Sequence, residues 1–260
     1  MTVLTEVLRK QARYNARRAD MEIDDRNNGE ELWGIYDRSH RHYAVWFEVA
    51  EDFFEKIVAE RRSMGLGVCA LDVMSGLGFL ESLGVEGVVV GLTRDDERAR
   101  EAKGHKRYWV GGDILRERKR IWKEVDQLVS AHFPGGFNII TLRGVGGMDA
   151  LTENPLIRFM LFQNMWGRLA EHGVILAETN DLCDQLISQK GLIEWWNQQG
   201  GIKAEKVGGG ILLRKGKDAP STLPLNFRFR TRDIRSWCVS KCYLEDEMHS
   251  GRSPLDEGKI

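Results

Sequence analysis

Short apolar runs alternate with longer amphipathic stretches from residue 68 to residue 216, and this alternation restricts the fold more than any other feature of the sequence. The runs predict strands, and the stretches between them have the spacing of helices. Strands that alternate with helices form a mainly parallel sheet covered on both faces, so an α/β fold is expected. The expected strands are Val68–Val73, Val88–Leu92, Arg107–Val110, Phe137–Leu142, Gly173–Ala177 and an antiparallel hairpin of Lys203–Val207 with Ile211–Arg214.

Helices are expected between these strands and ahead of them. Asn154 and Pro155 supply an N-cap and a first-turn proline for one of them. Upstream of the first strand, apolar residues on one side predict a single helix over Val45–Arg62. The other expected helices are Thr2–Ala19, Phe79–Leu83, Arg94–Lys103, Ile114–His132, Leu156–Glu171 and Asp184–Gln199.

The flanking segments divide the chain into three expected parts. Residues 1–62 form an N-terminal helical cap or lid, residues 63–216 the α/β domain, and residues 217–260 a C-terminal extension. In the extension, L-N-F-R-F-R-T-R alternates apolar and polar residues as a half-buried strand does. Its arginine face is interpreted as solvated, with phosphate or carboxylate binding as the alternative.

A dense group of polar and aromatic side chains precedes the expected helix at Val45. Two interpretations stay open, because such residues either line a pocket or form a satisfied helix entry. The group contains Tyr36, Asp37, His40, His42 and Tyr43.

Composition excludes several classes of protein. Hydrophobic residues make up 42% of the chain and charged residues 30%, which is typical of a globular protein, and the net charge of -1 argues against a globally basic nucleic-acid binder. Four cysteines are too few for a disulfide framework and favour a reducing compartment. Cys238, Cys242 and His249 lack paired C-x-x-C spacing, so no metal site is predicted.

The sequence also predicts a cytoplasmic protein without a membrane partner. No stretch approaches the roughly 18 to 20 apolar residues of a membrane span. Glu6, Arg9 and Lys10 interrupt the amino terminus before a signal-peptide core forms.

The segment V-C-A-L-D-V-M-S-G-L-G contains the candidate ligand site. Asp72 is the one acidic residue in an apolar run, and Gly76 and Gly78 then allow close approach of a ligand to the backbone. A buried carboxylate needs a partner, so Asp72 either forms hydrogen bonds within the turn or faces a ligand there. Ligands of parallel sheets bind at the carboxyl ends of strands, which makes this turn the first site to consider.

This segment resembles the first motif of the class I S-adenosylmethionine-dependent methyltransferases, an acidic residue followed by a G-x-G-x-G turn after strand one. The resemblance covers about Asp37 to Gly216 and is clearest over Val68–Thr179, including F-N-I-I-T-L-R-G-V-G and R-L-A-E-H-G-V-I-L-A-E-T. It implies a Rossmann-like doubly wound, mainly parallel seven-stranded sheet with an antiparallel C-terminal hairpin, plus N-terminal helices.

The resemblance also implies a cofactor, S-adenosylmethionine, and residues that bind it. Asp72 braces the loop beneath the methionyl part, Thr93 stands where a ribose-binding carboxylate is expected, and an acidic residue after strand three meets the adenine amino group. The implied cofactor-binding residues are Asp72, Ser75, Gly76, Gly78, Thr93 and Asp113.

Methyl transfer from a sulfonium depends mainly on positioning. Arg143 and Glu178, at the ends of strands four and five, border the acceptor by this resemblance, with Arg143 as an anion anchor. Glu178, His40 and His42 are the candidate bases, each with a salt bridge or helix cap as the alternative role. The sequence carries no N-P-P-Y motif, no cysteine pair placed for base methylation and no appended nucleic-acid module, which favours a small-molecule acceptor. The oligomeric state is not specified.

Three residues depart from the family pattern, and two of them, Met74 and Thr93, support a second hypothesis. Met74 replaces the first glycine of the turn, Thr93 replaces the ribose-binding carboxylate, and Asn138 replaces an acidic residue common in strand four. A methyltransferase-like binding or scaffold protein without catalysis is therefore an alternative. An RNA methyltransferase that uses the arginines of the C-terminal extension is another. A nicotinamide or flavin enzyme lacks support, because G-x-G-x-x-G is absent from the turn.

Overall fold

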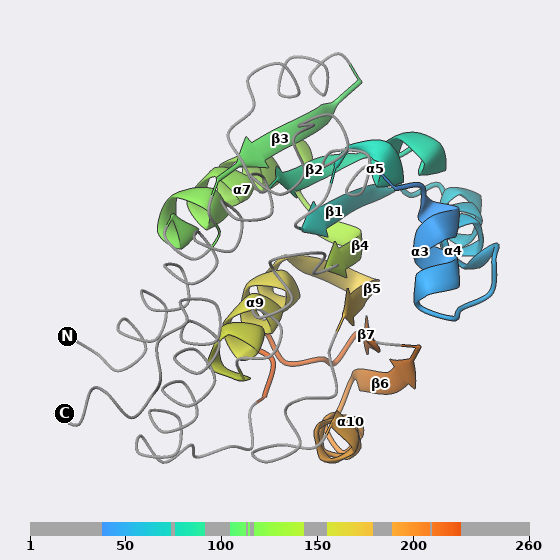
Figure 1. The fold of residues 1–260 in the computed structure, drawn as a ribbon, viewed down its shortest axis with the longest axis vertical. Coiled ribbons are helices and arrows are strands. Elements are labelled where there is room, and N and C mark those ends of the chain that lie inside the picture. Colours follow the sequence, from blue (N-terminus) through green and yellow to red (C-terminus); the bar gives the residue numbers. More distant parts are fainter. Residues whose placement is uncertain are drawn as a thin grey trace, which may run out of the picture.

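The computed structural model describes residues 38–73, 76–91, 105–112, 114, 117–142, 155–178, 189–208 and 210–224. They form a seven-stranded sheet in the order β3-β2-β1-β4-β5-β7-β6 (Figure 1). The predicted α/β fold class is confirmed. The strands are β1 (Cys69–Val73), β2 (Glu86–Gly91), β3 (Arg107–Gly111), β4 (Phe137–Leu142), β5 (Leu169–Glu178), β6 (Ile202–Val207) and β7 (Gly210–Lys215).

Strand pairing gives the parallel part of the sheet a defined carboxyl edge. β1 pairs in parallel with β2 and with β4, and the pairs β2–β3 and β4–β5 are parallel as well. β7 runs antiparallel to both β5 and β6, as the predicted hairpin requires. The order 3-2-1-4-5 is that of a doubly wound Rossmann sheet, whose ligands bind outside the carboxyl ends where the strand order reverses. That reversal lies here between β1 and β4.

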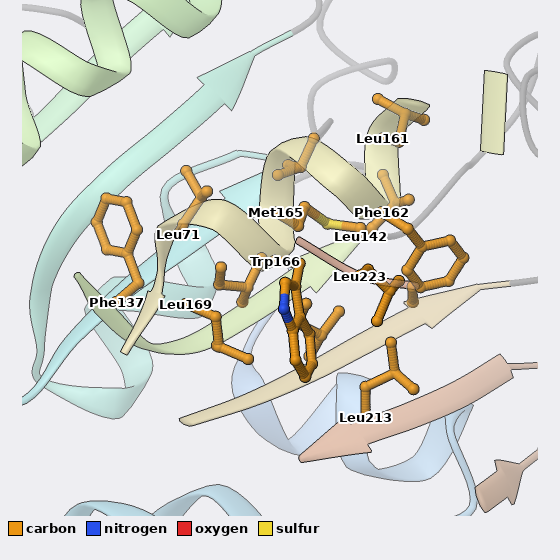
Figure 2. Close-up of a cluster of buried hydrophobic side chains, with 14 of the residues drawn as sticks. Leu71, Phe137, Leu142, Leu161, Phe162, Met165, Trp166, Leu169, Leu213 and Leu223 are labelled. Atoms are coloured by element: carbon orange, nitrogen blue, oxygen red, sulfur yellow. The ribbon is translucent and has the colours of Figure 1, made fainter. Parts of the chain in front are cut away.

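Helices cover both faces of the sheet, and each face has its own apolar core. One core joins the strands to α3 (His40–Trp46), α4 (Phe53–Ser63) and α5 (Gly78–Leu83). The other joins them to α7 (Arg118–His132), α9 (Pro155–Arg168) and α10 (Gln189–Asn197). Figure 2 shows this second core, where Trp166 extends from α9 toward Leu213 of β7.

The single helix predicted over Val45–Arg62 is wrong, because the chain forms two helices there. α3 ends at Trp46 and α4 begins at Phe53. Glu48 adopts a left-handed backbone conformation with φ of 50°, and the Val49 N–H donates to the Ala44 carbonyl. These are features of a Schellman-type helix end, which apolar periodicity does not reveal.

The junction between α9 and β5 also differs from the expectation. The helix predicted over Leu156–Glu171 ends at Arg168, and β5 begins at Leu169 rather than at Gly173. Lys215 explains the early end, since its ammonium donates to the carbonyls of Trp166 and Leu169. Leu169 then pairs with Phe137 of β4.

The described start of the predicted C-terminal extension packs against the second core. Leu223 is buried, and the Trp166 indole N–H donates to the Pro220 carbonyl at 2.8 Å.

The boundary at residue 216 stays a prediction, as does the cap over residues 1–62. The helices predicted over Thr2–Ala19 and Arg94–Lys103 and the strand after Leu225 lie outside the described residues. No helix in the described ranges is both long and apolar enough to cross a membrane.

Candidate ligand site at the carboxyl edge of β1 and β4

The turn after β1 lies at the point where the strand order reverses. β1 ends at Val73, Gly76 is buried, and α5 begins at Gly78. Met74 and Ser75 lie outside the described residues. This is the place where doubly wound sheets bind their ligands.

Asp72 is fully buried in β1 and is held by donors from two other elements. The Thr141 hydroxyl of β4 donates to Oδ1 at 2.6 Å. The Tyr43 hydroxyl of α3 lies 3.1 Å from Oδ2 and 3.3 Å from Oδ1. These contacts are the partners that a buried carboxylate requires.

Asp72 and Glu178 lie on the same face of the sheet. Asp72 pairs with Thr141, and Thr141 pairs with Leu176 of β5, so their side chains point to one side. Glu178 follows Leu176 by two residues and therefore points to that side as well. It ends β5 and is 6% exposed, which places a buried carboxylate farther toward the carboxyl edge.

The aromatic side chain at the C-cap of α3 packs against the strand position that pairs with Glu178. Gly210 pairs with Glu178, and a Cβ at Gly210 would lie 2.7 Å from Cε1 of Phe47. A Cβ at Gly208 would lie 3.0 Å from the Trp46 carbonyl oxygen. The turn of the β6–β7 hairpin thus needs glycine to fit against the end of α3.

His40 is buried beside the site, and both of its ring nitrogens contact protein groups. Nδ1 lies 2.9 Å from the Ser82 hydroxyl of α5, and Nε2 lies 2.7 Å from the Glu55 carboxylate of α4. The His40 backbone N–H donates to the same Ser82 hydroxyl at 2.9 Å. These contacts match the satisfied helix entry, one of the two interpretations left open by the sequence.

Two titratable groups have shifted pKa values, Glu55 of α4 and Cys69 of β1, and the Cys69 side chain packs on the opposite face of the sheet from Asp72. Burial alone would raise the pKa of Glu55, but a backbone hydrogen bond and the His40 ring outweigh it and lower the pKa. Burial raises the pKa of the Cys69 thiol to about 11, although the Asn138 contact opposes this. Asn138 Oδ1 accepts from the Cys69 N–H at 3.0 Å, so Asn138 acts at the amino end of β1, away from the candidate site.

Four candidate residues lie outside the described ranges, namely Ser75, Thr93, Asp113 and Arg143. Their chain neighbours nevertheless reach the same edge, because β2 ends at Gly91 and β4 ends at Leu142.

Cys238, Cys242 and His249 also lie outside the described ranges, and the described part of the chain holds no cluster of metal-ligating side chains.

Sequence reasoning did not assign Tyr43 and Thr141 to the site. Thr141 carried a usable signal, because it is a hydroxyl in the otherwise apolar end of F-N-I-I-T-L, as Asp72 is in its own strand. Tyr43 carried none that distinguishes it from the neighbouring aromatic residues of α3.

The turn fits a nucleoside cofactor in two respects. Gly76 and Gly78 carry no side chain, which allows a ligand to approach the backbone closely at these two positions. Hydroxyl donors from Tyr43 and Thr141 already hold the carboxylate before them, so the buried Asp72 does not need a cation as its partner.

No family model matches the chain, and no curated protein matches it. Solved structures do match. MycE, a methyltransferase from the mycinamycin biosynthetic pathway in complex with Mg and SAH, is 10% identical, with a TM-score of 0.43, 77% of this chain covered and 60% of MycE. An O-methyltransferase family protein from Burkholderia thailandensis is 12% identical, with a TM-score of 0.38, 64% of this chain covered and 59% of that protein.

A third similar structure is SAM-bound CalS10, an amino pentose methyltransferase from Micromonospora echinaspora. It is 14% identical, with a TM-score of 0.35, and the match covers 65% of this chain and 91% of CalS10. The chain thus spans only about 60% of the length of MycE and of the Burkholderia protein. With its strand order and its antiparallel hairpin, the chain has the Rossmann-like fold that the methyltransferase resemblance implied.

Proposed function

We propose that this chain is an S-adenosylmethionine-dependent methyltransferase that acts on a small-molecule acceptor. The main support is the position of Asp72, a buried and hydrogen-bonded carboxylate immediately before a glycine turn at the point where the strand order reverses. In doubly wound sheets this is the position where ligands bind.

The cofactor would be held by the turn and by the neighbouring strand ends. We assign Asp72 to brace the turn and Ser75, Gly76 and Gly78 to form it. Thr93 and Asp113, which follow β2 and β3, are assigned to the ribose and the adenine. When bound, S-adenosylmethionine supplies a methyl group on a sulfonium, whose in-line transfer depends mainly on positioning.

The acceptor would lie near the ends of β4 and β5. Glu178 is our candidate for the group that accepts a proton from, or hydrogen-bonds to, a hydroxyl or amine acceptor, because it is a carboxylate at that edge on the same face as Asp72. Phe47 supplies an apolar wall beside it. Arg143, directly after β4, is assigned to an anionic group of the acceptor. His40 is a weaker candidate, since Ser82 and Glu55 contact both ring nitrogens.

Calorimetric titration with S-adenosylmethionine and S-adenosylhomocysteine tests the proposal. Wild-type protein should bind both, and Asp72→Asn and Gly78→Val should each weaken binding more than tenfold, which is about 1.4 kcal/mol or more. Asp126→Asn is the matched control, because it makes the same chemical change on α7, on the opposite face.

Each alternative function has its own outcome. Wild-type protein that gives neither binding heat nor thermal stabilisation by either compound would favour a scaffold protein without catalysis. Binding of RNA that weakens steeply with salt would favour an RNA acceptor over a small molecule.

The low number of cysteines supports a cytoplasmic location, which stays a prediction.

A further inference from the structure

Tyr43 contacts both ends of the turn between β1 and α5. Its hydroxyl lies 3.1 Å from the Asp72 carboxylate, which precedes the turn. Its ring centroid lies 4.9 Å from that of Phe79, which follows Gly78 at the start of α5. Tyr43 is 1% exposed, so these contacts leave the side chain little freedom to move. One residue of α3 therefore joins the strand and the helix that flank the turn.

The two oxygens of Asp72 have different donors. A phenol carries one hydrogen, and the shorter of its two distances, 3.1 Å, points to Oδ2. Thr141 donates to Oδ1 at 2.6 Å. Rotating the carboxylate would break both hydrogen bonds in a buried environment, where an unmade bond is costly. Tyr43 and Thr141 together fix the plane of this carboxylate.

α3 is itself held in place on three sides. His40 contacts Ser82 of α5 and Glu55 of α4. At the other end of the helix, Phe47 packs against Gly210 of β7. These contacts from α4, α5 and β7 hold the helix with the Tyr43 hydroxyl against Asp72.

We propose that Tyr43 is a positioning residue of the cofactor site. It orients Asp72 and, through Asp72 and Phe79, sets the geometry of the turn that contains Gly76 and Gly78. α3 is then part of the cofactor site and is required for tight binding, beyond its role as a cover of the sheet. This inference rests on the proposed binding of S-adenosylmethionine.

Tyr43→Phe tests the inference, since it removes the hydroxyl and keeps the ring against Phe79. The dissociation constant of S-adenosylhomocysteine should rise about tenfold, or about 1.4 kcal/mol. Tyr108→Phe is the matched control on β3, where the ring stacks on His132, and its affinity should equal that of the wild type. A merely structural role for Tyr43 would lower the unfolding temperature and leave the affinity unchanged, and that result would overturn the inference.

A double-mutant cycle tests whether Tyr43 changes the affinity for S-adenosylhomocysteine through Asp72. If Tyr43 acts through Asp72, Tyr43→Phe should change the affinity less than about twofold in an Asp72→Asn background, because coupled residues are not additive. An equal loss in both backgrounds would show that Tyr43 acts without Asp72, against the inference.

Hydrogen exchange on the wild-type protein tests the inference without depending on the folding of any variant. Saturating S-adenosylhomocysteine should slow amide exchange in residues 40–47 more than in α7. Equal changes in the two segments would overturn the inference. Wild-type protein that binds neither compound would overturn both it and the proposed function, whereas wild-type binding with an unaffected Tyr43→Phe overturns the inference alone.

Discussion

The indole ring of Trp109 lies directly against the α-carbon of Gly91 on the neighbouring strand. A Cβ at Gly91 would lie 1.9 Å from Cζ2 of the ring, far inside contact distance. In the register of β2 and β3, Trp109 pairs with Val89 and Gly91 pairs with Gly111. The ring therefore fills the space that a side chain at the end of β2 would occupy.

Replacing Gly91 should consequently destabilise the protein. Gly91→Ala forces the buried indole or the strand to shift, and overpacking of this kind costs about 1–3 kcal/mol. Denaturant unfolding measures the loss. Gly135→Ala is the control, because a Cβ there meets nothing within 4 Å. If both variants unfold at the same denaturant concentration as the wild type, the packing of Trp109 on Gly91 is not as described.

Removing the Thr141 hydroxyl should also lower stability. Thr141→Val keeps the shape of the side chain but takes away the 2.6 Å donor of the buried Asp72 carboxylate. A buried acceptor that loses its donor costs about 1–3 kcal/mol, at the upper end when it is charged. The free energy of unfolding of this variant can be compared with that of Thr222→Val, which makes the same change at an exposed position. A loss no larger than that of Thr222→Val would contradict the prediction.

The contact between Glu55 and His40 predicts a pH dependence of stability. The folded protein lowers the pKa of Glu55 below the ordinary glutamate value of 4.5. A lowered carboxyl pKa contributes stability that is present above the unfolded pKa and is lost as pH falls through the folded one. The stability deficit of Glu55→Gln relative to the wild type should therefore be present at neutral pH and shrink below about pH 4.

Unfolding temperatures of the two proteins, taken from about pH 7 to about pH 3, check this sign. Glu51→Gln is the control, since Glu51 is 76% exposed and its distance to Arg41 is 4.0 Å. A Glu55→Gln deficit that is constant with pH, or grows on acidification, would refute the assignment.

The Cys69 thiol should be unreactive in the folded protein. Because burial raises its pKa to about 11, only about one molecule in a thousand carries the reactive thiolate at pH 8. Alkylation by iodoacetamide at pH 8, followed by peptide mass spectrometry, should label Cys69 much faster after unfolding in urea than before it. Fast labelling of the native protein would show that the thiol is accessible and ionised.

Strand positions could be predicted well because buried parallel strands are continuous apolar runs. The same rule pointed to Asp72, since a carboxylate inside such a run requires an explanation. The partners of Asp72 could not be predicted, because they depend on which distant segments the fold brings together. Tyr43 reaches Asp72 from within α3, which begins at His40, whereas the predicted helix began at Val45 and left Tyr43 outside it.

Asn138 shows a second limit of sequence comparison. By resemblance to the family, Asn138 stands in place of an acidic residue common in strand four. In the structure its side chain accepts a hydrogen bond from the Cys69 N–H at the amino end of β1. Whether a residue lies at the amino end or at the carboxyl end of its strand depends on where the strand starts. That start is the least certain part of a sequence-based assignment.

The groups that satisfy Asp72 are 29 and 69 residues distant from it in sequence. During synthesis, α3 and β1 leave the ribosome well before the Thr141 hydroxyl exists in the chain. A nascent chain interrupted before β4 would therefore contain the carboxylate and the glycine turn but not the second donor. Contacts of such long range form late and slowly. The ligand binding proposed for this turn should accordingly begin only when translation has passed β4, and a stalled-ribosome experiment can measure at which chain length it appears.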